Sequence, residues 1–220
     1  MPPSRRQNPG AKQPSRYHHG NLPEAMLKEA VRTIQKQGVE ALTLRGVGER
    51  LGVSRTALYR HFADKQALLA AVAAEGFRTL RTALAAAWES GGRGREGFDA
   101  MGLAYVRFAV THPSHYRVMF GGYLDRKRRD PELESEGPAA FQVLVDAIVT
   151  LQKRGEIVAD HPLHVARFVW ATVHGVAMLA INGLLMCADE QAVIAVTRYA
   201  ALRLGSGIGA HAAPAPAGDQ

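Results

Sequence analysis

The stretch of sequence that decides the fold is TLRGVGERLGVSRTALYRHF, residues 43–62. It has the pattern of two short helices, because Thr43 and Ser54 are both residues that commonly cap a helix N-terminus. Gly52 lies between them and can adopt the left-handed backbone conformation of a sharp turn. Four apolar residues are spaced so that they can pack the two helices against each other at a steep angle, namely Val47, Leu51, Val53 and Leu58. The stretch therefore predicts a helix-turn-helix.

Helical periodicity continues on both sides of this motif, and no segment has sustained strand-like alternation. Before it, Asn21 and Glu24 form a capping-box-like pair at the start of a helix that stops at Gly38. After it, Asp64 caps a long helix to about Ser90. Further helices are expected over residues 98–110, 113–121, 141–154, about 160–186 and 189–204. We therefore expect an all-α protein.

The positive charge of the chain is concentrated around the motif. The chain carries a net charge of +7, from 27 Lys and Arg against 20 Asp and Glu. Residues 1–65 hold 12 of the basic and 5 of the acidic residues, whereas the remaining 155 hold 15 of each. The whole excess lies in the first third, as expected for a surface that faces phosphates. For the basic segment from Arg5 to Arg16, the alternative interpretation is a solvated, disordered tail that does not face phosphates.

The second helix of the motif has the features of a DNA-recognition helix. Capping by Ser54 leaves its first turn free to point Arg55 and Thr56 outward, where short side chains reach base edges in a major groove. Tyr59 and Lys65 add groups spaced to meet the flanking phosphates. Any antiparallel helix pair can contain a glycine turn and two caps, so the turn alone leaves a structural role open. The preceding helix and the local charge favour DNA.

The stretch YHHGNLPEAMLKEAVRTIQKQGVEALTLRGVGERLGVSRTALYRHFADKQALLAAV, residues 17–72, closely resembles the DNA-binding domain of the TetR/AcrR family, most specifically in the run GVSRTALYRHFADK. The resemblance implies a homodimer on a pseudo-palindromic operator in double-stranded DNA. Matching positions are expected to contact DNA, and they are Arg45, Ser54, Arg55, Thr56, Tyr59, His61 and Lys65. Gly48 departs from the alanine usual in the family, and its small size is expected to preserve the packing.

The second half of the chain contains HPSHYRVMFGG, residues 112–122, and WATVHG, residues 170–175. Both are similar to the C-terminal domain of a TetR subfamily with a Trp-His-Gly signature. This similarity implies dimerisation through the last two helices and a pocket for a small-molecule effector. The expected domains are a flexible basic arm at 1–16, a three-helix DNA-binding domain at 17–65, an effector-binding and dimerisation domain at 66–204 and a disordered tail at 205–220.

Trp170 and His174 are four residues apart and therefore lie on one face of a helix. Together with other aromatic and methionine residues they form a candidate cavity for a largely apolar effector, with ordinary core packing as the alternative. The other candidates are Tyr105, Phe108, Tyr116, Met119, Phe120 and Met178. Residues 126–136, RKRRDPELESE, alternate in charge and are expected to form an exposed loop.

Motifs of other classes of site are missing from the sequence. Structural zinc sites usually include cysteines, and Cys187 is the only one, so no metal and no cofactor are expected. The sequence has no Gly-rich phosphate loop or nucleophile elbow, so we do not expect an enzyme. The lone cysteine and the basic N-terminus without an apolar stretch behind it are typical of a cytoplasmic protein.

Residues 168–188 form an uncharged stretch of 21 residues, long enough to cross a bilayer. Polar residues and glycines interrupt it, which favours a helix buried between the domain core and a partner subunit over a membrane span. The chain as a whole is expected to be a ligand-responsive repressor. The alternatives are a helical interaction protein with a vestigial DNA-binding domain and an enzyme that uses the cavity.

Overall fold

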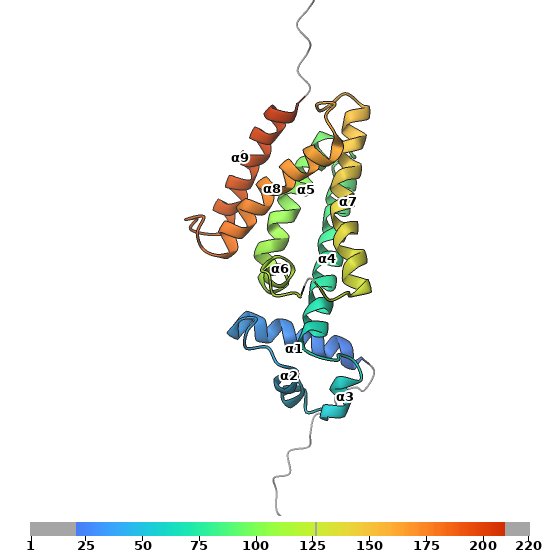
Figure 1. Cartoon of the computed structure of the whole chain (residues 1–220). Helices are drawn as coiled ribbons and strands as arrows, with labels where there is room; N and C mark the ends of the chain where they lie inside the picture. Colours follow the sequence, from blue (N-terminus) through green and yellow to red (C-terminus); the bar gives the residue numbers. More distant parts are fainter. Residues whose placement is uncertain (1–20, 126, 210–220) are drawn as a thin grey trace, which may run out of the picture.

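The computed structural model describes residues 21–125 and 127–209 of the chain. The expected basic arm and most of the expected tail lie outside these residues. Within them, the chain forms α-helices and no strand, which confirms the all-α prediction (Figure 1). The helices are α1 (Leu22–Gln37), α2 (Leu44–Leu51), α3 (Arg55–Tyr59), α4 (Lys65–Ser90), α5 (Arg95–Thr111), α6 (Pro113–Phe120), α7 (Pro131–Lys153), α8 (Pro162–Ile181) and α9 (Glu190–Ile208).

Side-chain caps fix the starts of the N-terminal helices where the sequence predicts them. The Thr43 hydroxyl accepts a hydrogen bond from the backbone N–H of Gly46 at 3.0 Å, and the Ser54 hydroxyl accepts one from that of Ala57 at 3.3 Å. Gly52 ends α2 with φ +67°, in the left-handed region that glycine adopts without steric cost. Helices α2 and α3 therefore form the predicted helix-turn-helix.

Helices α2 and α3 approach each other closely at Gly48. Val47 and Leu58 are fully buried between the helices of this small domain. A Cβ added at Gly48 would overlap the Leu58 side chain. Glycine at position 48 therefore lets Leu58 of α3 pack directly against α2, and an alanine methyl group here would have to displace that core side chain.

Helix α4 connects the N-terminal domain with the larger helical domain. The Asp64 carboxylate caps it by accepting a hydrogen bond from the backbone N–H of Ala67 at 2.9 Å. The helix runs the length of the larger domain and packs against α5, α6 and α7 (Figure 1). Any displacement of its first turn therefore moves α3 relative to the second domain.

The predicted loop over residues 126–136 is wrong from residue 131 onward, because α7 begins at Pro131. The start signals are ordinary ones: the Asp130 carboxylate accepts a hydrogen bond from the Leu133 N–H at 3.0 Å, and proline is favoured in a first turn. Pro138 lies inside α7, where proline has no N–H to donate to the helix. This proline obscured the helical pattern in the sequence.

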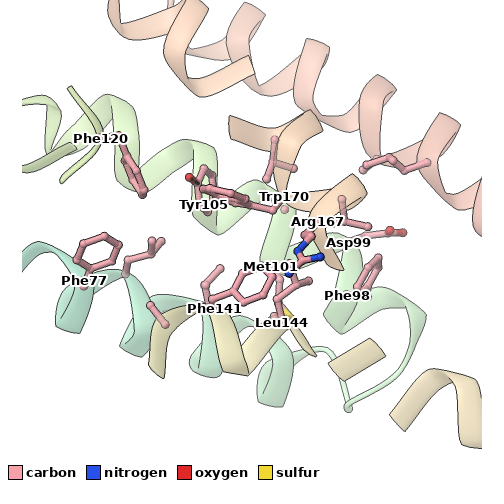
Figure 2. Close-up of a pocket in the computed structure, with 18 of the residues that line it drawn as sticks. Phe77, Phe98, Asp99, Met101, Tyr105, Phe120, Phe141, Leu144, Arg167 and Trp170 are labelled. Atoms are coloured by element: carbon pink, nitrogen blue, oxygen red, sulfur yellow. Dashed lines mark hydrogen bonds between the residues drawn. The ribbon is translucent and has the colours of Figure 1, made fainter. Parts of the chain in front are cut away.

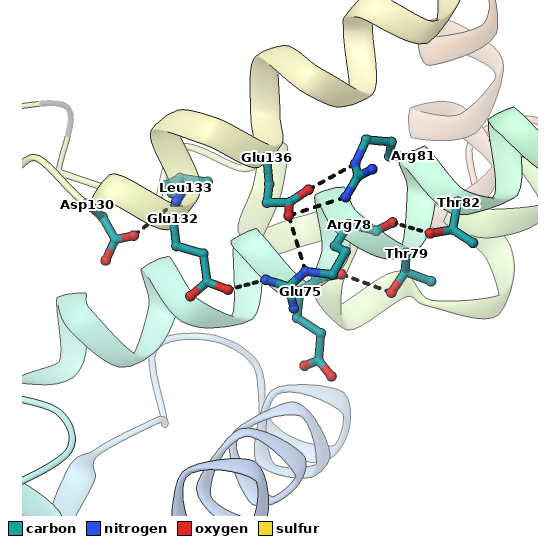
Figure 3. Close-up of polar contacts among 9 residues, drawn as sticks. All are labelled: Glu75, Arg78, Thr79, Arg81, Thr82, Asp130, Glu132, Leu133 and Glu136. Carbon is teal, nitrogen blue, oxygen red and sulfur yellow. Dashed lines mark hydrogen bonds and ion pairs between the residues drawn. The ribbon is translucent and has the colours of Figure 1, made fainter.

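The acidic residues of that segment lie on a helix and not in the predicted loop; Glu132 and Glu134 are exposed, as expected, whereas Glu136 is partly buried. Glu136 of α7 accepts hydrogen bonds from Arg78 at 3.2 Å and from Arg81 at 3.1 Å, both on α4, while Glu132 pairs with Arg78 (Figure 3). The neighbouring arginines lower the pKa of Glu136. This cluster joins α4 to α7 along their solvent edge.

Two helix ends near the C-terminus differ from the prediction. Helix α8 ends at Ile181 and not near residue 186, and α9 continues to Ile208, so residues 205–208 of the predicted tail are helical. The carbonyl of Ile208 accepts a hydrogen bond from Val158 N–H at 2.8 Å, which holds the end of α9 against the loop after α7.

Helix α8 alone among the described helices is long and apolar enough to cross a membrane, by length and composition only. In this fold it packs against α5, α7 and α9. Val165 and Ala177 lie in the core, whereas Phe168 and Leu179 are exposed on the opposite side. The inward-facing side of α8 therefore belongs to the core of the helical domain.

Candidate DNA-binding surface and ligand cavity

The outward side of α3 carries the residues expected at DNA. Leu58 is buried beneath the helix, whereas Arg55, Thr56 and Tyr59 are exposed on the other side. The Arg55 guanidinium lies 5.4 Å from the centroid of the Tyr59 ring. This arrangement presents a charged group, a hydroxyl and an amphipathic ring together on a short helix held by the Ser54 cap.

The remaining predicted contact residues lie around α3 but differ in their exposure and in their hydrogen-bond partners. His61, in the turn after α3, is exposed. Arg45 on α2 is exposed and its guanidinium Nε donates to Glu49 at 2.8 Å. Lys65, the first residue of α4, is partly buried, and its amine donates to the Glu40 carbonyl at 3.1 Å. Contact with a phosphate would require Lys65 to share or exchange this bond.

A cavity of about 330 Å³ lies in the second domain, between α4, α5, α7 and α8 (Figure 2). Its wall is made mainly of aromatic and aliphatic side chains, with Asp99 and Arg167 as its two charged residues. A space of this size with a few polar groups is typical of small-molecule sites. The larger lining side chains are Phe77, Leu80, Leu84, Phe98, Met101, Tyr105, Phe120, Phe141, Leu144 and Trp170.

The cavity wall differs from the predicted one. Three of the eight predicted residues line it, namely Tyr105, Phe120 and Trp170. The other five lie outside the wall, and they are Phe108, Tyr116, Met119, His174 and Met178.

The five residues outside the wall are engaged elsewhere. Phe108 is buried and stacks on His112, with ring centroids 5.0 Å apart. Met119 packs next to Gly76 of α4. Met178 is partly buried against the core, and Tyr116 and His174 lie behind the wall. The predicted residues lie on α5, α6 and α8, and each of these helices contributes to the cavity wall. Helical spacing did not show which face of each helix lines the cavity.

Tyr116 and His174 are joined to the cavity wall through hydrogen bonds. The Trp170 indole N–H donates to the Tyr105 hydroxyl at 3.1 Å, and that hydroxyl lies 3.1 Å from the hydroxyl of Tyr116. Tyr116 lies 2.7 Å and Tyr105 3.0 Å from Nδ1 of His174. Trp170 can only donate, so Tyr105 accepts at that bond. One direction that satisfies all of these groups runs from Trp170 to Tyr105 to Tyr116 to Nδ1, with the His174 proton on Nε2.

Burial keeps this network in one protonation state. It raises the pKa of Tyr105 to about 12 and also raises that of Tyr116, so both phenols keep their protons. It lowers the pKa of His174, because a charged imidazolium is poorly solvated there. The network is therefore neutral at neutral pH and connects α5, α6 and α8.

We expect Tyr105→Phe to destabilise the protein more than Tyr116→Phe. Tyr105 is the acceptor of the Trp170 N–H, so its loss leaves a donor unpaired and should cost about 2 kcal/mol. Without the Tyr116 hydroxyl, Tyr105 can still donate to His174, and the cost should be about 1 kcal/mol. Urea unfolding measures both, with Tyr59→Phe, an exposed tyrosine on α3, as the control. Equal costs would contradict the role of Tyr105 as the acceptor of the Trp170 N–H.

Sequence reasoning missed the charged residues Asp99 and Arg167. Arg167 lies three residues before Trp170, on the same face of α8, and this spacing could have identified it. Asp99 is half-buried on α5, and burial raises the pKa of its carboxyl while Arg95 opposes that shift.

The surface formed by α8, α9 and the loop between them carries large exposed apolar side chains. Exposed fractions are 54% for Phe168, 43% for Leu179, 61% for Tyr199 and 64% for Leu202, and Met186 in the loop reaches 95%. These residues account for most of the large exposed hydrophobic side chains of the described chain. Such a concentration of exposed apolar side chains on two packed helices and their connecting loop indicates an interaction site.

Known protein families match both domains. Residues 26–72 match the model for bacterial regulatory proteins of the tetR family, and residues 98–202 match that for a tetracyclin repressor-like C-terminal domain. The chain is 33% identical to a protein of unknown function from Rhodococcus sp. RHA1, whose structure it matches with a TM-score of 0.78 over 89% of this chain and 100% of that one.

The N-terminal domain is also similar to that of characterised repressors. It is 48% identical over 50 residues to the class C tetracycline repressor protein of Escherichia coli, and the chain spans about a quarter of that protein's length. An HTH-type transcriptional regulator of Mycobacterium tuberculosis, Rv0681, is 26% identical over 177 residues, covering 77% of this chain and 75% of that protein. The chain therefore belongs to the tetR family of bacterial regulatory proteins, a family of transcriptional regulators and not of enzymes.

Proposed function

We propose that the protein is a ligand-responsive transcriptional repressor of the cytoplasm, which binds a pseudo-palindromic operator as a homodimer and leaves it when a small, largely apolar effector binds. The observation that carries this proposal is the exposed face of α3. Arg55, Thr56 and Tyr59 stand free on a helix whose first turn is capped by Ser54. This helix lies in the third of the chain that holds the whole positive excess.

The apolar surface of α8 and α9 supports the homodimer. A dimer buries about 800 Å² on each partner, and an obligate one is largely apolar. Exposed Phe168, Leu179, Tyr199 and Leu202 supply such a surface on the two helices. The two recognition helices of the dimer would then meet half-sites roughly 34–36 Å apart, or a multiple of that distance.

Contacts within the chain connect the cavity with the DNA-binding domain. Tyr116 of the hydrogen-bonded network lies on α6, and α6 packs against both α1 and α4. The first turn of α4 is tied to the loop after α6: Gln66 donates to the Tyr123 carbonyl and accepts from the Asp125 N–H, each at 3.1 Å, and Asp64 pairs with Arg128.

An effector that moves Trp170 or Tyr105 would therefore displace α6 and the start of α4, and so change the spacing of the two recognition helices. Its power to release DNA is limited to the difference between its affinities for the two states of the dimer.

The proposal is tested by fluorescence polarisation with duplexes from the region upstream of its own coding sequence, over a salt series. A dimer that makes 6–10 phosphate contacts should lose affinity by about a thousandfold or more between 50 and 200 mM salt. A scrambled duplex of equal length controls for non-specific binding. Absence of binding to any duplex at low salt would favour the helical interaction protein instead. Increased transcription from the bound promoter on deletion of the protein distinguishes a repressor from an activator.

A further inference from the structure

We propose that the cavity accepts an amphipathic organic anion, of the class of hydrocarbon carboxylates, whose head group is bound by Arg167 and whose tail lies among the aromatic side chains. This inference rests on the proposed function only for its regulatory consequence, because the binding site itself is defined by the cavity.

Arg167 is an exposed residue that contributes a cation to the wall of a largely apolar space. It lies one turn before Trp170 on α8, and Figure 2 shows its guanidinium pointing into the cavity next to Met101 and Leu144. Among the residues that the structure describes, none pairs with this guanidinium by a hydrogen bond or an ion pair. Its planar donors match a carboxylate, which can accept two hydrogen bonds from it at once.

The Asp99 carboxylate is the group in the cavity wall that would favour a cationic ligand over an anionic one. It already has an electrostatic partner, because Arg95 lies one turn earlier on α5 and acts on the Asp99 carboxyl. Burial also shifts this carboxyl toward its neutral form. In the cavity wall, Arg167 is the cation, and the negative charge of Asp99 is partly offset by Arg95 from outside the wall, so this end of the cavity favours an anion over a cation.

The opposite end of the cavity suits a hydrocarbon. Phe77 of α4 and Phe120 of α6 form an edge-to-face pair with ring centroids 5.5 Å apart, and Phe141 of α7 packs near Trp170. In Figure 2, Phe77 and Phe120 lie on the far side of the cavity from Asp99. Each methylene buried there should raise affinity about fourfold, so a ligand with a medium-length chain gains most of its affinity from the tail.

The test compares three probes with the same hydrocarbon tail, namely decanoate, decanol and decylamine. Binding of each to the full chain is measured by calorimetry at neutral pH without DNA. We expect decanoate to bind most tightly, decanol roughly tenfold more weakly because it lacks the charge, and decylamine most weakly. No binding of decanoate, or decylamine binding as tightly as decanoate, would overturn the proposal.

Variants then assign the head group to Arg167. Arg167→Gln should weaken decanoate roughly ten- to a hundredfold and leave decanol unchanged, since only the anion uses the guanidinium. Asp99→Asn should tighten decanoate severalfold, because a competing negative charge is removed. Arg107→Gln is the matched control, an exposed arginine on α5 outside the cavity wall. An unchanged preference for decanoate over decanol in Arg167→Gln would contradict the assignment.

The regulatory consequence is tested separately. Decanoate added to the protein on its operator should release the DNA, and Arg167→Gln should shift that release to higher concentrations by the same factor as its loss of affinity. Binding of decanoate without release would contradict the effector role and support the site alone. Failure to bind any operator would contradict the proposed function and would leave the calorimetric result standing.

Discussion

Replacing Arg55, Tyr59 and Lys65 together, as Arg55→Ala, Tyr59→Ala and Lys65→Gln, should weaken operator binding by about a thousandfold or more. A good base contact contributes about 1–3 kcal/mol, and each lost phosphate contact also reduces the salt dependence. Arg55 and Tyr59 are exposed on the outward face of α3, so their loss leaves the buried Leu58 contact intact. The measurement is a polarisation titration at fixed salt.

Two comparisons separate DNA contact from other causes. Arg107→Ala with Lys153→Gln removes the same positive charge from exposed positions on α5 and α7, and it should change affinity less than threefold because the charges are distant from α3. Lys65→Gln alone tests the bond to the Glu40 carbonyl, with thermal unfolding as the readout. Wild-type affinity in a folded triple variant would contradict the assignment of α3 as the recognition helix.

The N-terminal domain was the part of the fold that the sequence predicted best. Its helix starts depend on local chemistry, because the caps at Thr43, Ser54 and Asp64 each bond to a backbone N–H three residues later. The turn at Gly52 also depends on one residue. The close contact between Gly48 and Leu58 is of another kind, since the space available there depends on how α2 and α3 pack.

The second domain was predicted less well, because its cavity depends on contacts between distant segments. Periodicity places Trp170 and His174 on one side of α8, yet only Trp170 lies in the cavity wall. Glu136 falls in a predicted loop because the charges around it alternate in sign, and the sequence gives no local sign of its partners, Arg78 and Arg81, which lie more than fifty residues away. A pattern along one helix does not reveal which neighbouring helix a side chain faces.

Introducing charge into the apolar surface of the last two helices should give the second large effect. Phe168→Glu with Leu202→Glu places one carboxylate on α8 and one on α9, where 54% and 64% of the native side chains are exposed. In a monomer these carboxylates remain solvated, whereas a dimer would bury them without partners, at a cost of several kcal/mol. We therefore expect a folded monomer, measured by analytical ultracentrifugation and circular dichroism.

The monomer should also lose operator affinity by roughly two orders of magnitude or more, because linking two DNA-binding domains makes the second half-site contact intramolecular. Ser135→Glu with Gln142→Glu adds the same negative charge to exposed positions on α7 and should remain dimeric, so its affinity isolates the contribution of charge alone. A double variant that stays dimeric would place the interface elsewhere. A monomer that keeps full affinity for a palindromic duplex would show that α3 of one subunit suffices, because the paired half-sites would then contribute nothing to binding.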